Sequence, residues 1–353
     1  MMINQKIVRS VCKFIMLFWV IACSPYVFAI DFLHQTTPSI QSEEVAVVVN
    51  ELDVNSKLMG EYYLKARDIP AKNLILVSIP KASTLDLAEF AKLREKIYAE
   101  INPNIQVIVL MWTTPYAVNC NSITSAITLG YDAKQCEDSC AVGKKNPYFN
   151  SFSRNPAHDF NMRLAILLPT DSIELAKSVI DRGVLSSFKL NESTGYFLKT
   201  SDVNRTKPRE QFFPQFFTKI ETKKITLRPI SADSIKDKKD VMFYFTGLVS
   251  VPDLETLTFM PGAIADHLTS AGGILYNEGQ MSSLKWLEAG ATGTYGSVSE
   301  PCNYWQKFSN PKVLVGHYLA GETLIEAYWK SVYWPTQGLF IGEPLAAPFY
   351  KTH

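Results

Sequence analysis

The sequence predicts an α/β protein with a doubly wound, mostly parallel sheet. Three observations support this prediction: short continuous apolar runs recur along the chain, segments with helical spacing of apolar residues alternate with them, and polar or glycine-containing turns follow most of the runs. Continuous apolar runs are typical of strands that are covered on both faces. A β-α-β order favours parallel strands, because parallel neighbours need a crossover connection and a helix usually supplies it.

The first third of the chain shows this alternation most clearly. Strands are predicted at 45–49, 74–79 and 107–112, and helices at 58–66 and 87–97. Asn55 is expected to cap the first helix, and Ser83 and Asp86 have the spacing of a capping box before the second.

The rest of the chain continues the pattern with two interruptions. Further strands are predicted at 164–168, 241–245, 263–267, 295–298 and 339–341, and further helices at 171–183, 281–289 and 313–332. Residues 113–163 are predicted to form a long ordered loop that contains three cysteines. The charged segment 201–239 contains three prolines and is predicted to be an excursion from the domain.

The N-terminus has the composition of a secretory signal peptide. Three basic residues precede the apolar run 14–23, which is too short to span a bilayer comfortably. We expect cleavage after Ala29, which would leave 30–353 as a single α/β domain in the periplasm or outside the cell. An alternative is a lipobox that ends at Cys23, whose acylation would be the one expected contact with a membrane.

Composition excludes several kinds of partner. The formal net charge is +1, and residues 1–29 hold three basic and no acidic side chains, so the mature chain would be close to neutral. A near-neutral chain has no electrostatic attraction for nucleic acid. Gly290, Gly293 and Gly296 match neither the Walker A nor the dinucleotide-binding pattern, so no nucleotide and no other cofactor is expected.

Four cysteines would remain after removal of the signal peptide: Cys120, Cys136, Cys140 and Cys302. An even number of cysteines in an exported protein favours disulfides, although sequence alone leaves three pairings open. Free thiols and a metal site are the alternatives. Zinc sites usually combine more closely paired cysteines with a nearby histidine, so no metal is expected.

Ligands in open parallel sheets bind beyond the carboxyl ends of the strands. This rule predicts a functional face that contains Asn50, Thr113, Thr246, 267–273, 297–302 and Glu343.

A hydrolytic site could be built on that face. Ser270 is a candidate nucleophile and His267 its base, with Glu300 as the acidic partner, because Asp266 and His267 are adjacent on a strand and point to opposite faces. Cys302 is a second candidate nucleophile. His267, Glu300 and Cys302 also have structural interpretations, as a hydrogen-bonded core histidine, a turn carboxylate beside a cysteine, and half of a disulfide, respectively.

Several long motifs resemble a family of exported bacterial proteins of unknown function. They read RDIPAKN (67–73), SITSA (122–126), MPGAIADHLTSAGG (260–273), QMSSLKWLEAGATGTYGSVSEPC (280–302) and HYLAGETLIEAYWKSVYWPTQGLFIGEPLAAPF (317–349). The resemblance covers nearly the whole mature chain, and it implies no established activity.

The last third also resembles, more distantly, the catalytic region of gingipain-type, caspase-like cysteine peptidases. Those enzymes carry a His-Gly pair after one strand and a cysteine after the next. The corresponding positions here read Thr246-Gly247 and LTSAGG (268–273), without the histidine or the cysteine. The resemblance therefore implies a caspase-like fold whose catalytic dyad is missing.

Two classes of function remain open. In the first, which we favour, the protein is a non-catalytic binding or assembly module whose ligand is a protein, peptide or glycan. In the second, it is a peptidase-like hydrolase with a rearranged site built from His267, Ser270, Glu300 and Cys302.

Overall fold

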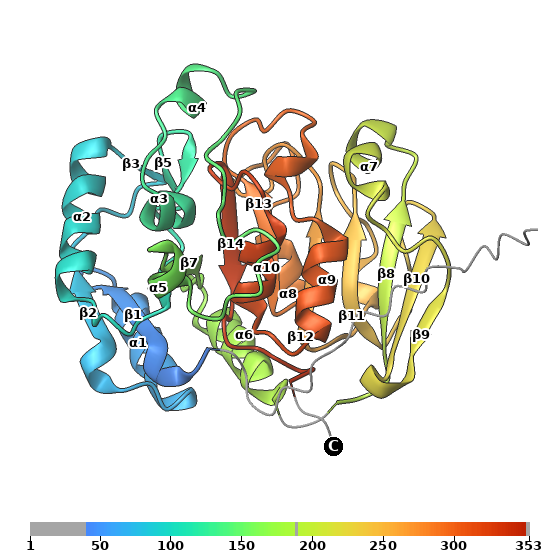
Figure 1. The fold of residues 1–353 in the computed structure, drawn as a ribbon, viewed down its shortest axis with the longest axis horizontal. Coiled ribbons are helices and arrows are strands. Elements are labelled where there is room, and N and C mark those ends of the chain that lie inside the picture. Colours follow the sequence, from blue (N-terminus) through green and yellow to red (C-terminus); the bar gives the residue numbers. More distant parts are fainter. Residues whose placement is uncertain (1–39, 188–189, 351–353) are drawn as a thin grey trace, which may run out of the picture. The chain divides into compact units, whose positions relative to one another are not determined.

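A mixed, mostly parallel sheet of eleven strands runs through the structure, which confirms the predicted α/β fold class (Figure 1). The computed structural model describes residues 40–187 and 190–350, so the predicted signal peptide and Cys23 lie outside the described residues. The strand order is β2-β1-β4-β7-β14-β13-β12-β11-β8-β10-β9. The strands of this sheet are β1 (Val45–Asn50), β2 (Leu74–Val77), β4 (Val107–Met111), β7 (Leu164–Leu167), β8 (Ser193–Lys199), β9 (Thr218–Ile220), β10 (Ile225–Ser231), β11 (Val241–Thr246), β12 (Phe259–His267), β13 (Gly293–Ser297) and β14 (Gly338–Gly342).

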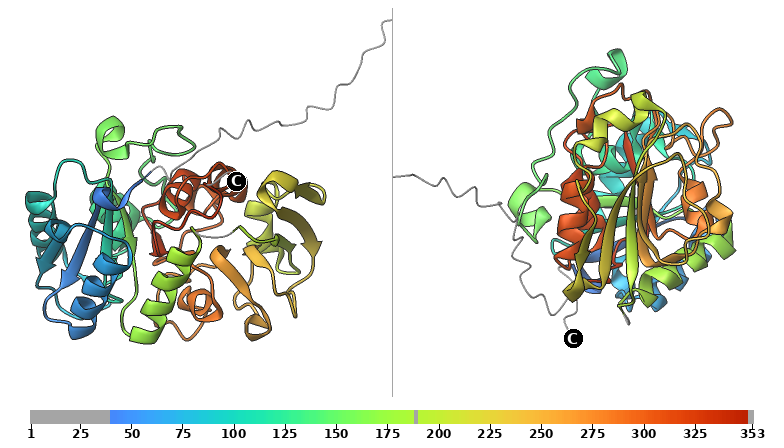
Figure 2. Two further views of the ribbon diagram at one scale, coloured as in Figure 1. Left: turned by 90° about the horizontal axis from the view of Figure 1, so that it is seen from below. Right: turned by 90° about the vertical axis from the view of Figure 1, so that its right-hand side faces the viewer.

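Helices cover both faces of this sheet (Figure 2). They are α1 (Val54–Ala66), α2 (Leu87–Glu100), α3 (Ile123–Leu129), α4 (Lys134–Glu137), α5 (Pro156–Phe160), α6 (Ile173–Leu185), α7 (Val203–Glu210), α8 (Leu284–Ala289), α9 (Pro311–Leu319) and α10 (Leu324–Ser331). Neighbouring residues of β11 show the two layers. Phe243 contacts Tyr318 of α9, whereas Tyr244 contacts Trp286 of α8, because successive side chains of a strand point to opposite faces.

The helices begin at side-chain caps, although not always at the predicted residue. Asp86, and not Ser83, caps α2, by accepting a hydrogen bond from the backbone N–H of Glu89. Asp53, and not Asn55, caps α1, and Ser172, and not Asp171, caps α6. In each corrected case, the helix begins within four residues of the predicted cap.

The predicted helix at 313–332 is two helices, α9 and α10. The chain turns between them at Gly321, whose φ of +95° is rarely adopted by residues with a side chain. Thr323 and Glu326 then form a capping box at the start of α10. The apolar spacing of 313–332 is continuous and by itself predicts one helix, but the capping box at Thr323 starts a second helix within it.

The predicted excursion at 201–239 is largely part of the sheet. It contains α7 and β9, and its strand β10 pairs in parallel with β8 over seven register positions from Ile225↔Ser193 to Ser231↔Lys199. Strand β8 has no counterpart among the sequence-based predictions. The many polar residues of β10 reflect its position near the edge of the sheet, where one side is only partly covered.

The segment 113–163, predicted to be an ordered loop, contains short helices and strands. A small three-stranded sheet joins β3 (Thr84–Leu85), β5 (Ala117–Val118) and β6 (Asn121–Ser122). Helix α3 follows directly and is buried along almost its whole length.

Strand β14 lies between the two groups of parallel strands. It runs antiparallel to β13 over five register positions, and Ile341 is paired with Leu167 of β7 on its other side. Because β14 is antiparallel to β13, Glu343 lies beside Thr292 at the amino end of β13. This corrects the prediction that Glu343 belongs to the functional face at the carboxyl ends of the parallel strands.

Glu343 is instead a buried structural carboxylate. It has no solvent exposure, its Oε2 lies 2.5 Å from Nη2 of Arg67, and its Oε1 accepts a hydrogen bond from the Tyr63 hydroxyl at 2.7 Å. Both partners belong to the end of α1, so the first helix of the described chain fixes the end of its last strand.

None of the helices within 40–187 and 190–350 combines the length and the hydrophobicity needed to cross a bilayer.

We expect the substitution Arg67→Met to destabilise the protein by about 3–5 kcal/mol, because it leaves the buried Glu343 carboxylate without its cation. Chemical denaturation monitored by circular dichroism measures this loss. Lys65→Met, on the exposed side of the same helix, is the matched control and should change the free energy of unfolding by less than about 0.5 kcal/mol. Equal effects of the two substitutions would contradict the assignment.

Candidate functional site

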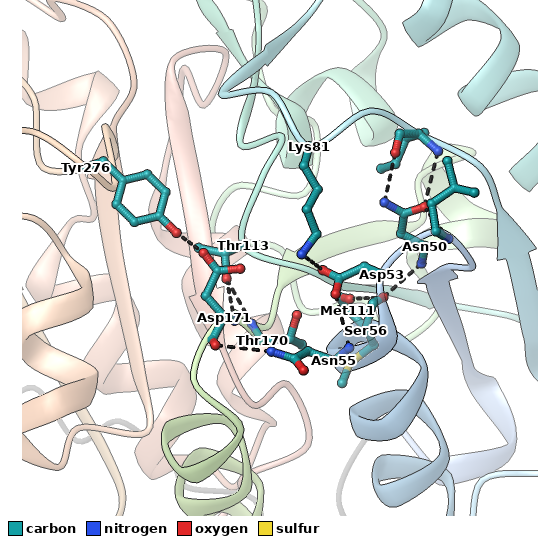
Figure 3. A network of polar contacts seen from close by, with 12 residues as sticks. Asn50, Asp53, Asn55, Ser56, Lys81, Met111, Thr113, Thr170, Asp171 and Tyr276 are labelled. Carbon is teal, nitrogen blue, oxygen red and sulfur yellow. Dashed lines mark hydrogen bonds and ion pairs between the residues drawn. The ribbon is translucent and has the colours of Figure 1, made fainter.

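Polar side chains link the carboxyl ends of β1, β4 and β7 (Figure 3). Asn50, the last residue of β1, receives the backbone N–H of Leu52 and donates to the carbonyl of Ile79 at 2.9 Å. Thr113, just after β4, accepts hydrogen bonds from the backbone N–H groups of Thr170 and Asp171 through its Oγ1. These contacts hold the turns in place and use the polar atoms that the carboxyl ends present.

Two charged groups of this edge point toward solvent. The ammonium of Lys81 lies 2.9 Å from Oδ2 of Asp53, whose other oxygen caps α1. The hydroxyl of Tyr276 donates to the exposed carboxylate of Asp171 (Figure 3). Burial, together with this carboxylate, raises the pKa of Tyr276 well above its ordinary value. Tyr276 belongs to the loop after β12, so the contact ties the two groups of parallel strands together at their carboxyl edge.

His267 is buried at the end of β12 and uses both ring nitrogens. Its Nδ1 accepts a hydrogen bond of 2.9 Å from the Trp286 indole N–H, which requires that Nε2 carry the proton that is donated to the Met281 carbonyl. Burial, reinforced by the positive charge of Arg209, lowers the pKa of His267 to about 3. The ring is therefore neutral at physiological pH and anchors the loop that ends at Met281.

Asp266 points to the opposite face from His267, as the strand geometry predicts. Its carboxylate forms an ion pair with Arg209 and accepts a hydrogen bond of 2.6 Å from Ser309. Arg209 also donates to the carbonyl of Thr246, the last residue of β11, at 2.6 Å. The side chains of Arg209 and Asp266 are at most 2% exposed, so they form a closed internal ion pair.

Helix α7 packs closely against the turn after β11. A Cβ atom on Gly247 would lie 2.2 Å from the carbonyl oxygen of Arg205 in α7, which leaves no space for a side chain at residue 247.

All four described cysteines form disulfides, as predicted, with the pairs Cys120–Cys136 and Cys140–Cys302. Because its sulfur is bonded to Cys140, Cys302 has no thiolate to act as a nucleophile. Glu300 is exposed and accepts the backbone N–H of Cys302 at 2.7 Å, so it shapes the turn that carries the disulfide. This matches the structural interpretation of both residues.

The predicted catalytic residues belong to two segments, around the end of β12 and after β13. Ser270 is half-buried in the loop after β12, three residues beyond His267. Glu300 and Cys302 belong to the disulfide-linked turn after β13. The two nitrogens of His267 are bonded to Trp286 and Met281, so the ring takes no proton from Ser270 in this arrangement.

A surface cavity of about 740 Å³ adjoins the first of these segments. The loop that His267 anchors forms one of its walls. The lining residues are 250, 251, 254 and 255, then 275–282, and then 284, 285, 288 and 289. Apolar side chains line its interior, among them Val251, Leu275 and Met281, and exposed charged side chains stand around them.

His317 and the carboxylates of 322 and 326 form a second buried polar group. Glu322 binds Lys330 at 2.8 Å and His317 at 3.1 Å, whereas Glu326 caps α10 through Thr323. The two carboxylates therefore have separate structural partners.

Sequence reasoning missed three residues that organise this edge: Arg209, Tyr276 and Lys307. Lys307 is buried and donates to the Ser139 carbonyl at 2.6 Å, and burial lowers its pKa to about 8. Each of them contacts a residue more than 50 positions away, so no local pattern indicates its role.

Comparison with known proteins leaves the family open. No protein-family model and no curated protein matches the sequence. A solved structure described as "Structure of Protease" is similar over 88% of this chain and 80% of its own, with a TM-score of 0.44 and 12% sequence identity. Within the described part of the chain, no group of three or more histidine, cysteine or acidic side chains is placed to hold a metal ion.

We expect acid to weaken the fold through His267. Its folded pKa of about 3 lies below the ordinary 6.5, so between these values the unfolded chain binds a proton that the folded chain does not. Stability contributed by the neutral ring is complete above pH 6.5 and should fall by about 2 kcal/mol by pH 5. Chemical denaturation at pH 7.5 and at pH 5 measures this difference in the free energy of unfolding. His267→Gln should remove this part of the pH dependence, and an unchanged slope in that variant would contradict the assignment.

The disulfides predict a simple labelling pattern. Iodoacetamide should add nothing to Cys120, Cys136, Cys140 or Cys302 in the folded, unreduced protein. After denaturation and reduction it should add four groups, which intact mass and peptide mapping would count. Labelling of Cys302 without reductant would show that it is a free thiol.

Proposed function

We propose that this chain is an exported, non-catalytic binding protein. A signal peptide at 1–29 directs export, and the cavity beside the carboxyl ends of β11 and β12 recognises a protein or peptide ligand. The two disulfides support the proposed export, because disulfides persist mainly in oxidising compartments. The proposal retains the peptidase-like fold that the sequence resemblance implies, without the chemistry of a peptidase.

The state of His267 carries the non-catalytic part of the proposal. A serine or cysteine nucleophile needs a base that can accept its proton. His267, the candidate base next to Ser270, is buried, neutral and bonded at both nitrogens. Its interaction with the Met281 carbonyl instead positions the loop that lines the cavity.

The cavity supports the binding part. Its volume is within the range of small-molecule and peptide sites, and it combines apolar lining with a few polar groups. Backbone hydrogen bonds give the cavity a defined shape: the N–H of Met281 donates to the Val249 carbonyl at 2.9 Å, and that of Ser283 donates to the Gly272 carbonyl at 2.8 Å. These bonds fix two turns of the chain beside the cavity.

A fluorophosphonate reagent should form no adduct with the folded protein. The physical reason is that Ser270 has no base to activate it, whereas an activated serine reacts with this reagent at once. Intact mass measures the result, with a known serine hydrolase as the positive control. An adduct at Ser270 that disappears in the denatured protein and in Ser270→Ala would establish a hydrolase and overturn the non-catalytic proposal.

A further inference from the structure

The charges around the cavity are unevenly distributed. Three exposed carboxylates line it, those of Glu255, Glu278 and Glu288, against the single ammonium of Lys285. Lys285 is already paired with Glu288 at 2.6 Å, so their charges largely cancel. Glu255 and Glu278 remain to determine the local potential, in a chain whose overall charge is close to zero.

The interior of the same cavity is apolar. Val251 and Leu275 are nearly fully buried beneath it, and Leu254, Met281 and Leu284 are half-buried in its walls. The ring of Tyr276, whose side chain is 54% exposed, stands at one side and is held in place by Asp171. An aromatic face that is fixed in this way attracts a cation as well as an apolar group.

We propose that the cavity binds an extended basic peptide, with an apolar side chain in the cavity and flanking lysine or arginine side chains at Glu255 and Glu278. This inference rests on the proposed binding function and deepens it by naming the class of ligand. Apolar burial provides affinity, and the two carboxylates select positive charge by complementarity. Glycans fit less well, because sugar sites usually present several aromatic faces and Tyr276 is the one aromatic residue that lines this cavity.

The test uses the purified mature protein and three capped, fluorescein-labelled pentapeptides. One alternates leucine and lysine (Leu-Lys-Leu-Lys-Leu), and in the others glutamine or glutamate replaces lysine. Fluorescence anisotropy should show binding of the lysine peptide at least about tenfold tighter than that of the glutamine peptide at low salt, and weaker binding as salt rises. Spermidine, which has positive charge but no apolar side chain, should compete poorly.

Substitutions locate the site. The double variant Glu255→Gln/Glu278→Gln should weaken binding of the lysine peptide about tenfold and leave the glutamine peptide unchanged. Glu255→Lys/Glu278→Lys should reverse the preference in favour of the glutamate peptide. Glu61→Gln/Glu95→Gln removes two exposed carboxylates from α1 and α2, far along the chain from the cavity, and is the matched control.

The outcomes separate this inference from the proposed function. Equal affinity for the three peptides, no binding of any of them, or equal effects of the cavity and control variants would overturn the basic-peptide assignment. Spermidine competition as strong as that of unlabelled lysine peptide would do the same. Cleavage of a bound peptide, detected by mass, would overturn the non-catalytic function even if the charge preference were as expected.

Discussion

The position of β14 in the middle of the sheet is the constraint on which the rest of the structure depends. This strand joins β13 over five register positions, but Ile341↔Leu167 is its one register pair with β7. Side-chain packing supplements the ladder there, since the Trp329 ring lies on that of Phe340 with centroids 4.3 Å apart. The buried ion pair of Glu343 with Arg67 then fixes the end of the strand to α1.

The buried polar groups at the carboxyl ends of the strands have partners in neighbouring turns and in α7. Polar groups that would otherwise be buried without partners are bonded across the turns: Asn50 to Ile79, Thr113 to Thr170, and Arg209 to Asp266. Such bonds are needed because an unpaired buried polar group or charge is costly. The side chains of Asp266 and His267 at the end of β12 are bonded in the same way, to Arg209 and to Trp286 and Met281.

A surface cavity lies at this edge of the sheet. His267 anchors one wall of the cavity through Met281, and Tyr276 reaches from the same loop to Asp171 on the neighbouring group of strands. One disulfide links Cys120 to Cys136 within the segment 113–163, and the other links Cys140 to Cys302 in the turn after β13. A cavity with hydrogen-bonded walls is consistent with the proposed binding function, since a preformed site loses little conformational freedom when its ligand binds.

The sequence by itself determined the α/β class and buried strands such as those predicted at 45–49 and 241–245, and it favoured disulfides for Cys120, Cys136, Cys140 and Cys302. These features follow from local apolar runs and from the number of cysteines, which need no knowledge of distant contacts. Only the tertiary structure decided that β10 belongs to the sheet, that Glu343 lies at the amino end of β13, and that His267 is neutral and bonded. The reason is physical: strand order, ion pairing and pKa depend on groups that meet across long separations, such as Arg209 and Asp266, 57 positions apart.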